Sequence, residues 1–175
     1  MATLLDSNPT INQNDNDVIE SASYTKAGNS FTSSANASLY SCKFNLKKSG
    51  SPTGNATAYL YAHTGVYGTS SLPGTLLATS NTFDVSTLTT SYQLIEFLFP
   101  GGQQPVLVAG MHYCIEFDYP GGDVSNQVII GLETPGTASG NSFHYFSGSY
   151  SAFGSDYIFE VYGVVINNSN MFLLF

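Results

Sequence analysis

The stretch Met111-His-Tyr-Cys-Ile-Glu-Phe-Asp-Tyr119 decides the fold class, because its side chains alternate in character at every step. A repeat of two residues is the spacing of a β-strand that buries one face and exposes the other. Pro120-Gly-Gly-Asp123 then ends the strand with turn-forming residues. The alternation assigns an inward and an outward set: Met111, Tyr113, Ile115, Phe117 and Tyr119 against Cys114, Glu116 and Asp118.

The same texture continues on both sides of this strand as short alternating runs separated by Gly, Pro, Ser and Asn. No apolar pattern with a helical period extends over the length of a helix, so a parallel sheet with helical crossovers is excluded. The sequence therefore predicts an all-β fold, a two-sheet antiparallel β-sandwich that is jelly-roll-like. The expected strands are 38–46, 56–63, 76–85, 92–99, 106–108, 112–119, 127–132, 142–146 and 157–166.

Three parts of the chain differ in composition. Residues 1–28 are polar and predict an N-terminal arm, residues 29–166 the β-sandwich domain, and residues 167–175 an apolar C-terminal tail. Large apolar side chains on free ends are costly in water, so we expect the two ends to be assembly contacts that dock on other subunits. For the tail, folding back on its own core is the alternative. The expected contacts are Leu4, Leu5, Ile11, Met171, Phe172, Leu173, Leu174 and Phe175.

Charge excludes some partners. The 175 residues carry four lysines, no arginine and a formal net charge of −8, which is too few cations to neutralise a nucleic-acid backbone. No run approaches the roughly 20 apolar residues of a membrane-spanning helix. The first residues also lack the apolar core of a secretory signal. We therefore expect a protein of a virion surface, with a cytoplasmic location, or an extracellular one without a signal peptide, as the alternative.

The two cysteines are not expected to form a disulfide. By the alternation of their strands, Cys42 points inward and Cys114 points outward, and side chains on opposite faces cannot be bridged.

No motif predicts catalysis. His63, His112 and His144 lie on three different expected strands without the spacing of a zinc site, and no nucleophile elbow is present. Glu116 and Asp118, with Glu96 able to face them from another strand, are the carboxylates from which a glycosidase could be built, but acidic side chains are common on sandwich surfaces. A non-enzymatic protein is therefore expected.

No cofactor is expected, with a structural calcium ion as the alternative. Residues 14–17 with Glu20, and Asp118 with Asp123, offer oxygen ligands, although neither group matches an EF-hand loop.

Aromatic side chains give the clearest prediction of a binding surface. Tyrosine rings can stack on a sugar, and neighbouring Asn, Asp and Ser can bind its hydroxyls. Half-buried packing within the sandwich is the alternative role for such residues. The expected glycan-binding set is Tyr145, Tyr150, Phe153 and Tyr157, with Tyr59, Tyr61 and Tyr67 as a second exposed set.

Four segments, 30–37, 49–54, 74–80 and 109–113, resemble the jelly-roll β-sandwich modules of phage structural proteins and of bacterial surface and carbohydrate-binding proteins. The resemblance implies a structural or binding role, sometimes with carbohydrate contact, and assigns no functional residue. Two hypotheses follow. The first is a virion structural protein, a decoration or head-fibre-like subunit that binds itself or other virion proteins. The second is a carbohydrate-binding or host-attachment module that binds cell-surface glycans.

Overall fold

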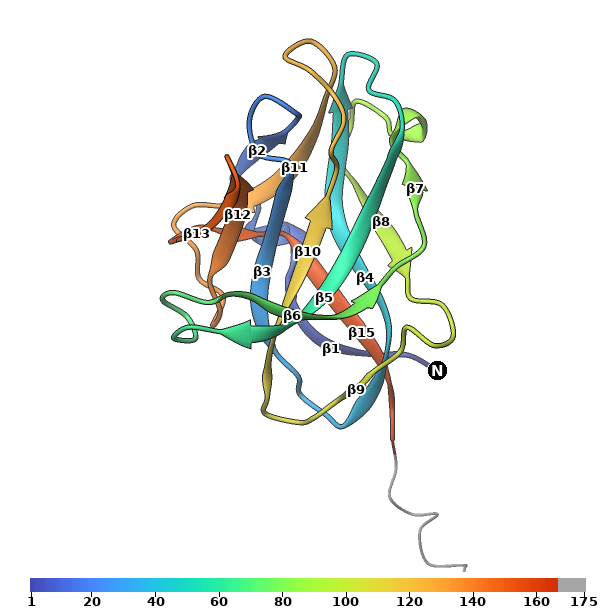
Figure 1. Cartoon of the computed structure of the whole chain (residues 1–175), viewed down its shortest axis with the longest axis vertical. Coiled ribbons are helices and arrows are strands. Elements are labelled where there is room, and N and C mark those ends of the chain that lie inside the picture. The colour runs from blue at the N-terminus through green and yellow to red at the C-terminus, as the bar shows by residue number, and fades with distance from the viewer. Residues whose placement is uncertain (167–175) are drawn as a thin grey trace, which may run out of the picture.

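Two antiparallel β-sheets packed face to face make up the protein (Figure 1). The structure, a computed structural model, describes residues 1–166. The predicted all-β, two-sheet antiparallel sandwich is confirmed. The predicted tail, residues 167–175 with Met171 to Phe175, lies outside the described residues.

Sheet B has seven strands, and its outer face is the one that matters below. Along the sheet the order is β13, β12, β3, β10, β5 and β6, and the short strand β7 pairs with β5. The bounds are β3 (Lys26–Thr32), β5 (Asn55–Thr64), β6 (Leu72–Thr79), β7 (Phe83–Asp84), β10 (His112–Asp118), β12 (Ser142–Phe146) and β13 (Ser149–Phe153).

Sheet A has eight strands arranged around the long strand β4. The order is β1, β15, β4, β11 and β14, with β2 paired to β11, and β8 and β9 paired to β4. The bounds are β1 (Thr3–Asn8), β2 (Asp15–Ile19), β4 (Ala37–Ser49), β8 (Gln93–Leu98), β9 (Val106–Leu107), β11 (Gln127–Glu133), β14 (Asp156–Tyr157) and β15 (Phe159–Val165); two 3-10 turns, η1 (Thr10–Asn12) and η2 (Val85–Thr87), connect strands.

The core between the sheets is built on aromatic side chains. Phe117 of β10 meets Phe44 of β4 and Phe97 of β8 at ring-centroid distances of 5.8 and 5.9 Å. All three rings are buried, in the tilted and edge-on arrangements that aromatic pairs prefer. The alternation in residues 111–119 therefore assigned Ile115 and Phe117 to the interior correctly.

The predicted N-terminal arm is wrong, because residues 3–32 are strands of the sandwich. β1 pairs with β15, β2 pairs with β11, and β3 lies in the centre of sheet B. Leu5 is buried in the core, and Asp6 accepts a hydrogen bond from the backbone N–H of Thr32. Ladder hydrogen bonds hold these strands whatever their side chains, so a polar composition concealed them.

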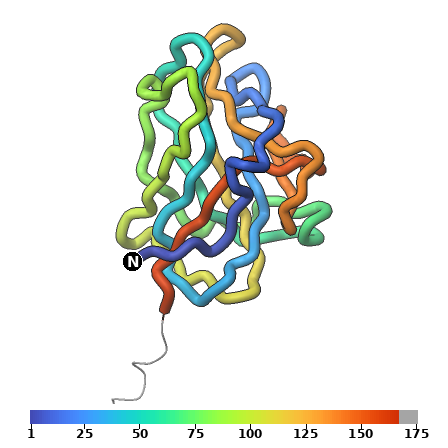
Figure 2. Tube along the Cα trace, turned by 180° about the vertical axis from the view of Figure 1, so that it is seen from behind, coloured from blue at the N-terminus to red at the C-terminus, as the bar shows by residue number. Residues whose placement is uncertain are grey.

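Both ends of the described chain lie at the same end of the sandwich (Figure 2). β15 runs to that end and finishes beside the first residues of β4, where the Ile166 N–H donates to the Asn36 carbonyl. Across residues 1–166 the structure contains no helix with the length and apolar character needed to cross a membrane.

Candidate functional site

The outer face of sheet B carries four rows of side chains that run across its strands. The strand register places each row, since directly paired residues point to the same side of a sheet. From one end of the face to the other, the rows are His63, His112 and Thr32; Tyr61, Cys114 and Ser30; Tyr59, Glu116, Gly28 and Phe143; and Thr57, Asp118, Lys26, Tyr145 and Tyr150.

Gly28 lets the β12–β13 hairpin curl over this face. A Cβ atom at Gly28 would clash with the backbone oxygen of Ile115 and would lie 2.6 Å from the ring of Phe143. With no side chain there, Phe143 packs directly over β3 and is fully buried. The sheet curls until its two edge strands, β13 and β6, contact each other. As a result, Tyr150 reaches a carboxylate that is three strands away in the sheet order.

A charged network lies under that hairpin. The Glu116 carboxylate accepts hydrogen bonds from the Tyr150 hydroxyl at 2.6 Å, the Tyr61 hydroxyl at 3.1 Å and the Lys26 ammonium at 3.3 Å. Lys26 also pairs with Asp118 at 3.4 Å. Glu116 has no exposed surface, so these three donors replace the water that a carboxylate needs.

Burial and charge shift the pKa values in this network. Burial raises the pKa of Glu116 above its usual value, although Lys26 and the Tyr150 hydroxyl act in the opposite direction. Burial also raises the pKa of Asp118, against the effect of Lys26. For Lys26, burial lowers the pKa, but the Glu116 and Asp118 charges outweigh it and the net shift is upward. Lys26 is therefore a permanent cation.

Two tyrosine rings flank that cation. The Lys26 ammonium lies 5.4 Å from the ring centroid of Tyr59 and 5.6 Å from that of Tyr145, within the range of cation–π attraction. Among the described residues, neither hydroxyl has a hydrogen-bond partner, and both side chains are partly exposed. We call the set Tyr59, Tyr61, Tyr145 and Tyr150 with Lys26, Glu116 and Asp118 the tyrosine face.

A second aromatic group borders the tyrosine face. The ring of Tyr67, at the tip of the β5–β6 hairpin, stacks on His112 with centroids 3.8 Å apart, and His112 meets His63 at 5.6 Å. The Tyr67 hydroxyl also bonds Ser139, so the bent hairpin is fixed to the loop before β12. Burial lowers the pKa of His63, and the neighbouring His112 lowers it further.

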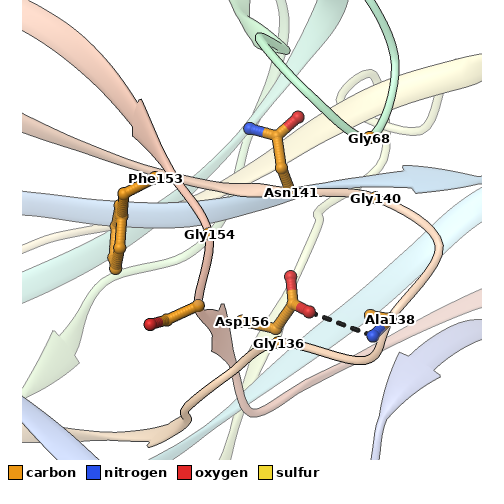
Figure 3. A pocket seen from close by; sticks show the side chains of 9 residues that line it. Gly68, Gly136, Ala138, Gly140, Asn141, Phe153, Gly154 and Asp156 are labelled. Carbon is orange, nitrogen blue, oxygen red and sulfur yellow. Dashed lines mark hydrogen bonds between the residues drawn. The ribbon is translucent and has the colours of Figure 1, made fainter.

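A small cavity of about 120 Å³ opens beside that loop, at the edge of the sandwich (Figure 3). Its polar group is Asp156, whose carboxylate accepts hydrogen bonds from the Asn29 amide at 2.8 Å and the Ala138 N–H at 3.0 Å. Burial raises the pKa of Asp156 to about 6, against the effect of these donors. Glycines make up most of the remaining lining, so much of the cavity wall is backbone. These residues are Gly68, Gly136, Gly140, Asn141, Phe153, Gly154 and Ser155.

The four residues predicted to bind glycans divide between two environments. Tyr145 and Tyr150 lie together on the tyrosine face, with ring centroids 4.9 Å apart. Phe153 points to the opposite side of β13, between His144 and Tyr157. Tyr157 is fully buried and donates to Asp17, so it is a core residue and not a stacking platform. Tyr145, Tyr150 and Phe153 belong to the β12–β13 hairpin, and side chains that alternate along its strands point to opposite faces.

The predicted assembly contacts in the N-terminal segment also divide. Leu5 is 4% exposed and belongs to the core, so it cannot contact another subunit. Leu4 is 44% exposed and Ile11 is 88% exposed, so both remain available on the surface. In the pairing of β1 with β15, the register shifts between Leu4 and Asp6, and the two neighbouring leucines therefore differ in exposure.

The carboxylates considered for glycosidase chemistry are not arranged as a catalytic pair. Both oxygens of Glu116 are occupied by protein donors. Glu116 lies on the outer face of its sheet, as predicted, but it is not solvated, since Tyr150 covers it. Glu96 lies on β8 in the other sheet and accepts from Ser41. Within residues 1–166 no three His, Cys, Asp or Glu side chains are grouped to hold a metal ion.

The two cysteines lie on opposite faces of their sheets, as predicted, and both are free thiols. Cys42 is in the core. Cys114 is on the outer face of sheet B and yet fully buried, because the sheet curls over it.

Sequence reasoning found the tyrosines but not what joins them. The two predicted sets, one in β5 and one in β12–β13, form a single face because β10 and β3 lie between them. Lys26 was assigned to the arm, although its alternation with Ala27 was a signal that a strand begins there. Comparison of the chain with protein-family models, with curated proteins and with solved structures gave no match, so the site is described from its own geometry.

Proposed function

We propose that the protein is a non-enzymatic carbohydrate-binding module and that the tyrosine face is its binding surface. The observation that carries this proposal is the convergence of Tyr59, Tyr61, Tyr145 and Tyr150 around one buried ion-pair network. Sugars bind to partly exposed aromatic rings that are fixed in place and edged by polar groups. Here Tyr61 and Tyr150 are fixed by Glu116, while the Tyr59 and Tyr145 hydroxyls are left for a ligand.

The full-length protein on a glycan array, followed by calorimetry with the retained glycan, tests this proposal. Tyr59→Ala and Tyr145→Ala are each expected to weaken binding about five- to tenfold, since one aromatic contact contributes about 1–1.5 kcal/mol. Tyr40→Ala is the matched control, because Tyr40 is 39% exposed and lies on sheet A. Absence of any retained glycan, or an equal loss with the Tyr40 variant, would contradict the proposal.

A role as a subunit of a virion surface is the second candidate, and it is favoured by an apolar patch on sheet A. Leu4 and Leu98 share one row across the outer face of this sheet, and Val106 and Val164 share another. All four side chains are exposed. The patch carries no charge of its own, so a second copy of the same patch is the occupant that matches it in a symmetric dimer.

Light scattering on the full-length chain and on three altered forms of it tests this second candidate. If the patch holds copies together, Leu98→Gln lowers the solution mass from oligomer to monomer. Truncation after residue 170 separately tests the predicted tail contacts. Val124→Gln, which changes an exposed residue outside both the patch and the predicted contacts, is the control and should leave the mass unchanged. A monomeric full-length protein would contradict the assembly role.

A further inference from the structure

We infer that the tyrosine face selects neutral sugars and rejects sialylated, uronic and sulfated ones. This inference rests on the proposed function and names its ligand class. It is carried by the arrangement of charge around the face.

The only cation on the tyrosine face is already neutralised. The Lys26 ammonium pairs with Glu116 at 3.3 Å and with Asp118 at 3.4 Å. Its other sides are flanked by the rings of Tyr59 and Tyr145. The Lys26 side chain is only 22% exposed, so an anionic ligand would have to displace a carboxylate to form an ion pair with it.

No other basic side chain can take that role, because the remaining three lysines are all on β4 of sheet A. Lys43 pairs with Glu160 at 3.4 Å, Lys47 lies over the Tyr92 ring, and Lys48 donates to the Ser86 carbonyl. The sequence has no arginine. The paired cationic side chains with which proteins bind sulfates and sugar carboxylates therefore have no counterpart on sheet B.

The charges that remain on the face repel anions. Two carboxylates, Glu116 and Asp118, face the single lysine, so acidic groups outnumber cations on the face, within a chain of formal net charge −8. The neighbouring His63 does not offset this near neutral pH, since burial and His112 lower its pKa. An anionic sugar is therefore repelled by the face and not attracted to it. This repulsion is screened less in a partly buried site than in open water.

A neutral sugar, in contrast, finds partners without breaking the network. The Tyr59 and Tyr145 rings offer apolar surface, and their hydroxyls can donate and accept. Asp118 is partly exposed and keeps an oxygen that can accept from a sugar hydroxyl. The inference thus places the sugar over the row that holds Asp118, Lys26 and Tyr145.

The experiment compares one neutral glycan with its own sialylated and sulfated derivatives on the full-length protein by calorimetry. We expect the neutral form to bind at least about tenfold more tightly than either derivative. Its affinity should change less than about twofold between low and physiological salt, because no ion pair forms on binding. Tighter binding of a charged derivative, or a steep loss of the neutral glycan with salt, would overturn the inference.

Asp118→Asn sharpens the test, since it removes one neutralising charge while Glu116 still pairs with Lys26. In this variant the ratio of the affinities for the neutral and the charged glycan is expected to fall. An unfolding midpoint close to that of the wild type shows that the fold is kept. An unchanged preference in a folded variant would contradict the charge argument. The two proposals fail differently: a charged glycan that binds through Tyr59 and Tyr145 overturns the specificity alone, whereas a protein that binds no glycan overturns the proposed function itself.

Discussion

Gly28 shows how a single residue decides the shape of the candidate site. It occupies the one position on the outer face of β3 where the Phe143 ring must pass over the strand. The hairpin that brings Tyr150 to Glu116 depends on that passage. The constraint is close approach and not backbone conformation, because Gly28 is not among the residues with positive φ.

Gly28→Ala is therefore expected to lower the free energy of unfolding by about 1–3 kcal/mol, the usual cost of forcing an extra methyl into a packed site. Urea unfolding followed by tyrosine fluorescence measures the change. Gly101→Ala is the control, since nothing lies within 4 Å of a Cβ atom there and its φ is ordinary. Equal stability of the two variants would show that both the Phe143 ring and the β10 backbone at Ile115 can move aside.

At the scale of elements, β1 is the test of whether the first residues belong to the fold. Leu5→Ala is expected to destabilise the protein by about 2–4 kcal/mol, as for other buried leucines. Ile11→Ala should change stability by less than about 0.5 kcal/mol, because Ile11 is on the surface. Thermal unfolding of both variants measures the difference. A harmless Leu5→Ala would mean that the first strand is only loosely attached.

The elements that could be predicted from the sequence are those whose stability comes from side chains. β10 and β12 were predicted almost to the residue, because apolar and polar positions alternate along them. β1, β2 and β13 have no such alternation: β1 and β13 are edge strands, and β2 consists mainly of Asp and Asn. Their ladder hydrogen bonds depend on the partner strand, which no local pattern reveals.

The candidate site was only half predictable for a related reason. Aromatic residues with neighbouring polar groups pointed to Tyr145 and Tyr150 correctly. The separation of Tyr157 from them depends on which side of β13 and β14 each residue takes, and a bend after Phe153 changes that side. The burial of Glu116 depends on the curl of the whole sheet, which is a long-range property.

For the molecule as a whole, acidic pH is expected to be stabilising. Burial raises the pKa of four carboxylates: Asp6, Glu116, Asp118 and Asp156. For Asp156 the pKa rises from 3.8 to about 6, so its contribution to stability is full below 3.8 and is lost as the pH rises through 6. Two groups of residues oppose this trend. The half-buried His63 and His144 have lowered pKa values and become protonated at a cost to the folded state, and hydrogen bonds lower the pKa values of Asp84 and Asp123.

The Asp156 contribution is isolated by comparing the wild type with Asp156→Asn. Between about pH 4 and about pH 7 the wild type should lose more stability than the variant, because the variant has no charge to bury. Melting temperatures measured across this range give the comparison, and the other titrating groups cancel in the difference. Parallel curves would mean that Asp156 is as well solvated in the folded protein as in the unfolded chain.

The rate at which the Cys114 thiol is modified reports how often the folded protein opens locally. This thiol lies on the outer face of sheet B and outside the core cluster, whereas Cys42 is part of that core. Partial opening of a protein requires less free energy than complete unfolding. A thiol reagent should therefore modify Cys114 well before Cys42, and Tyr150→Phe, which removes the bond to Glu116, should accelerate only the first reaction, by about five- to tenfold. Identical rates at both thiols would mean that the curl and the core open as one unit. Different modification rates at the two thiols would measure how often the hairpin separates from the tyrosine face.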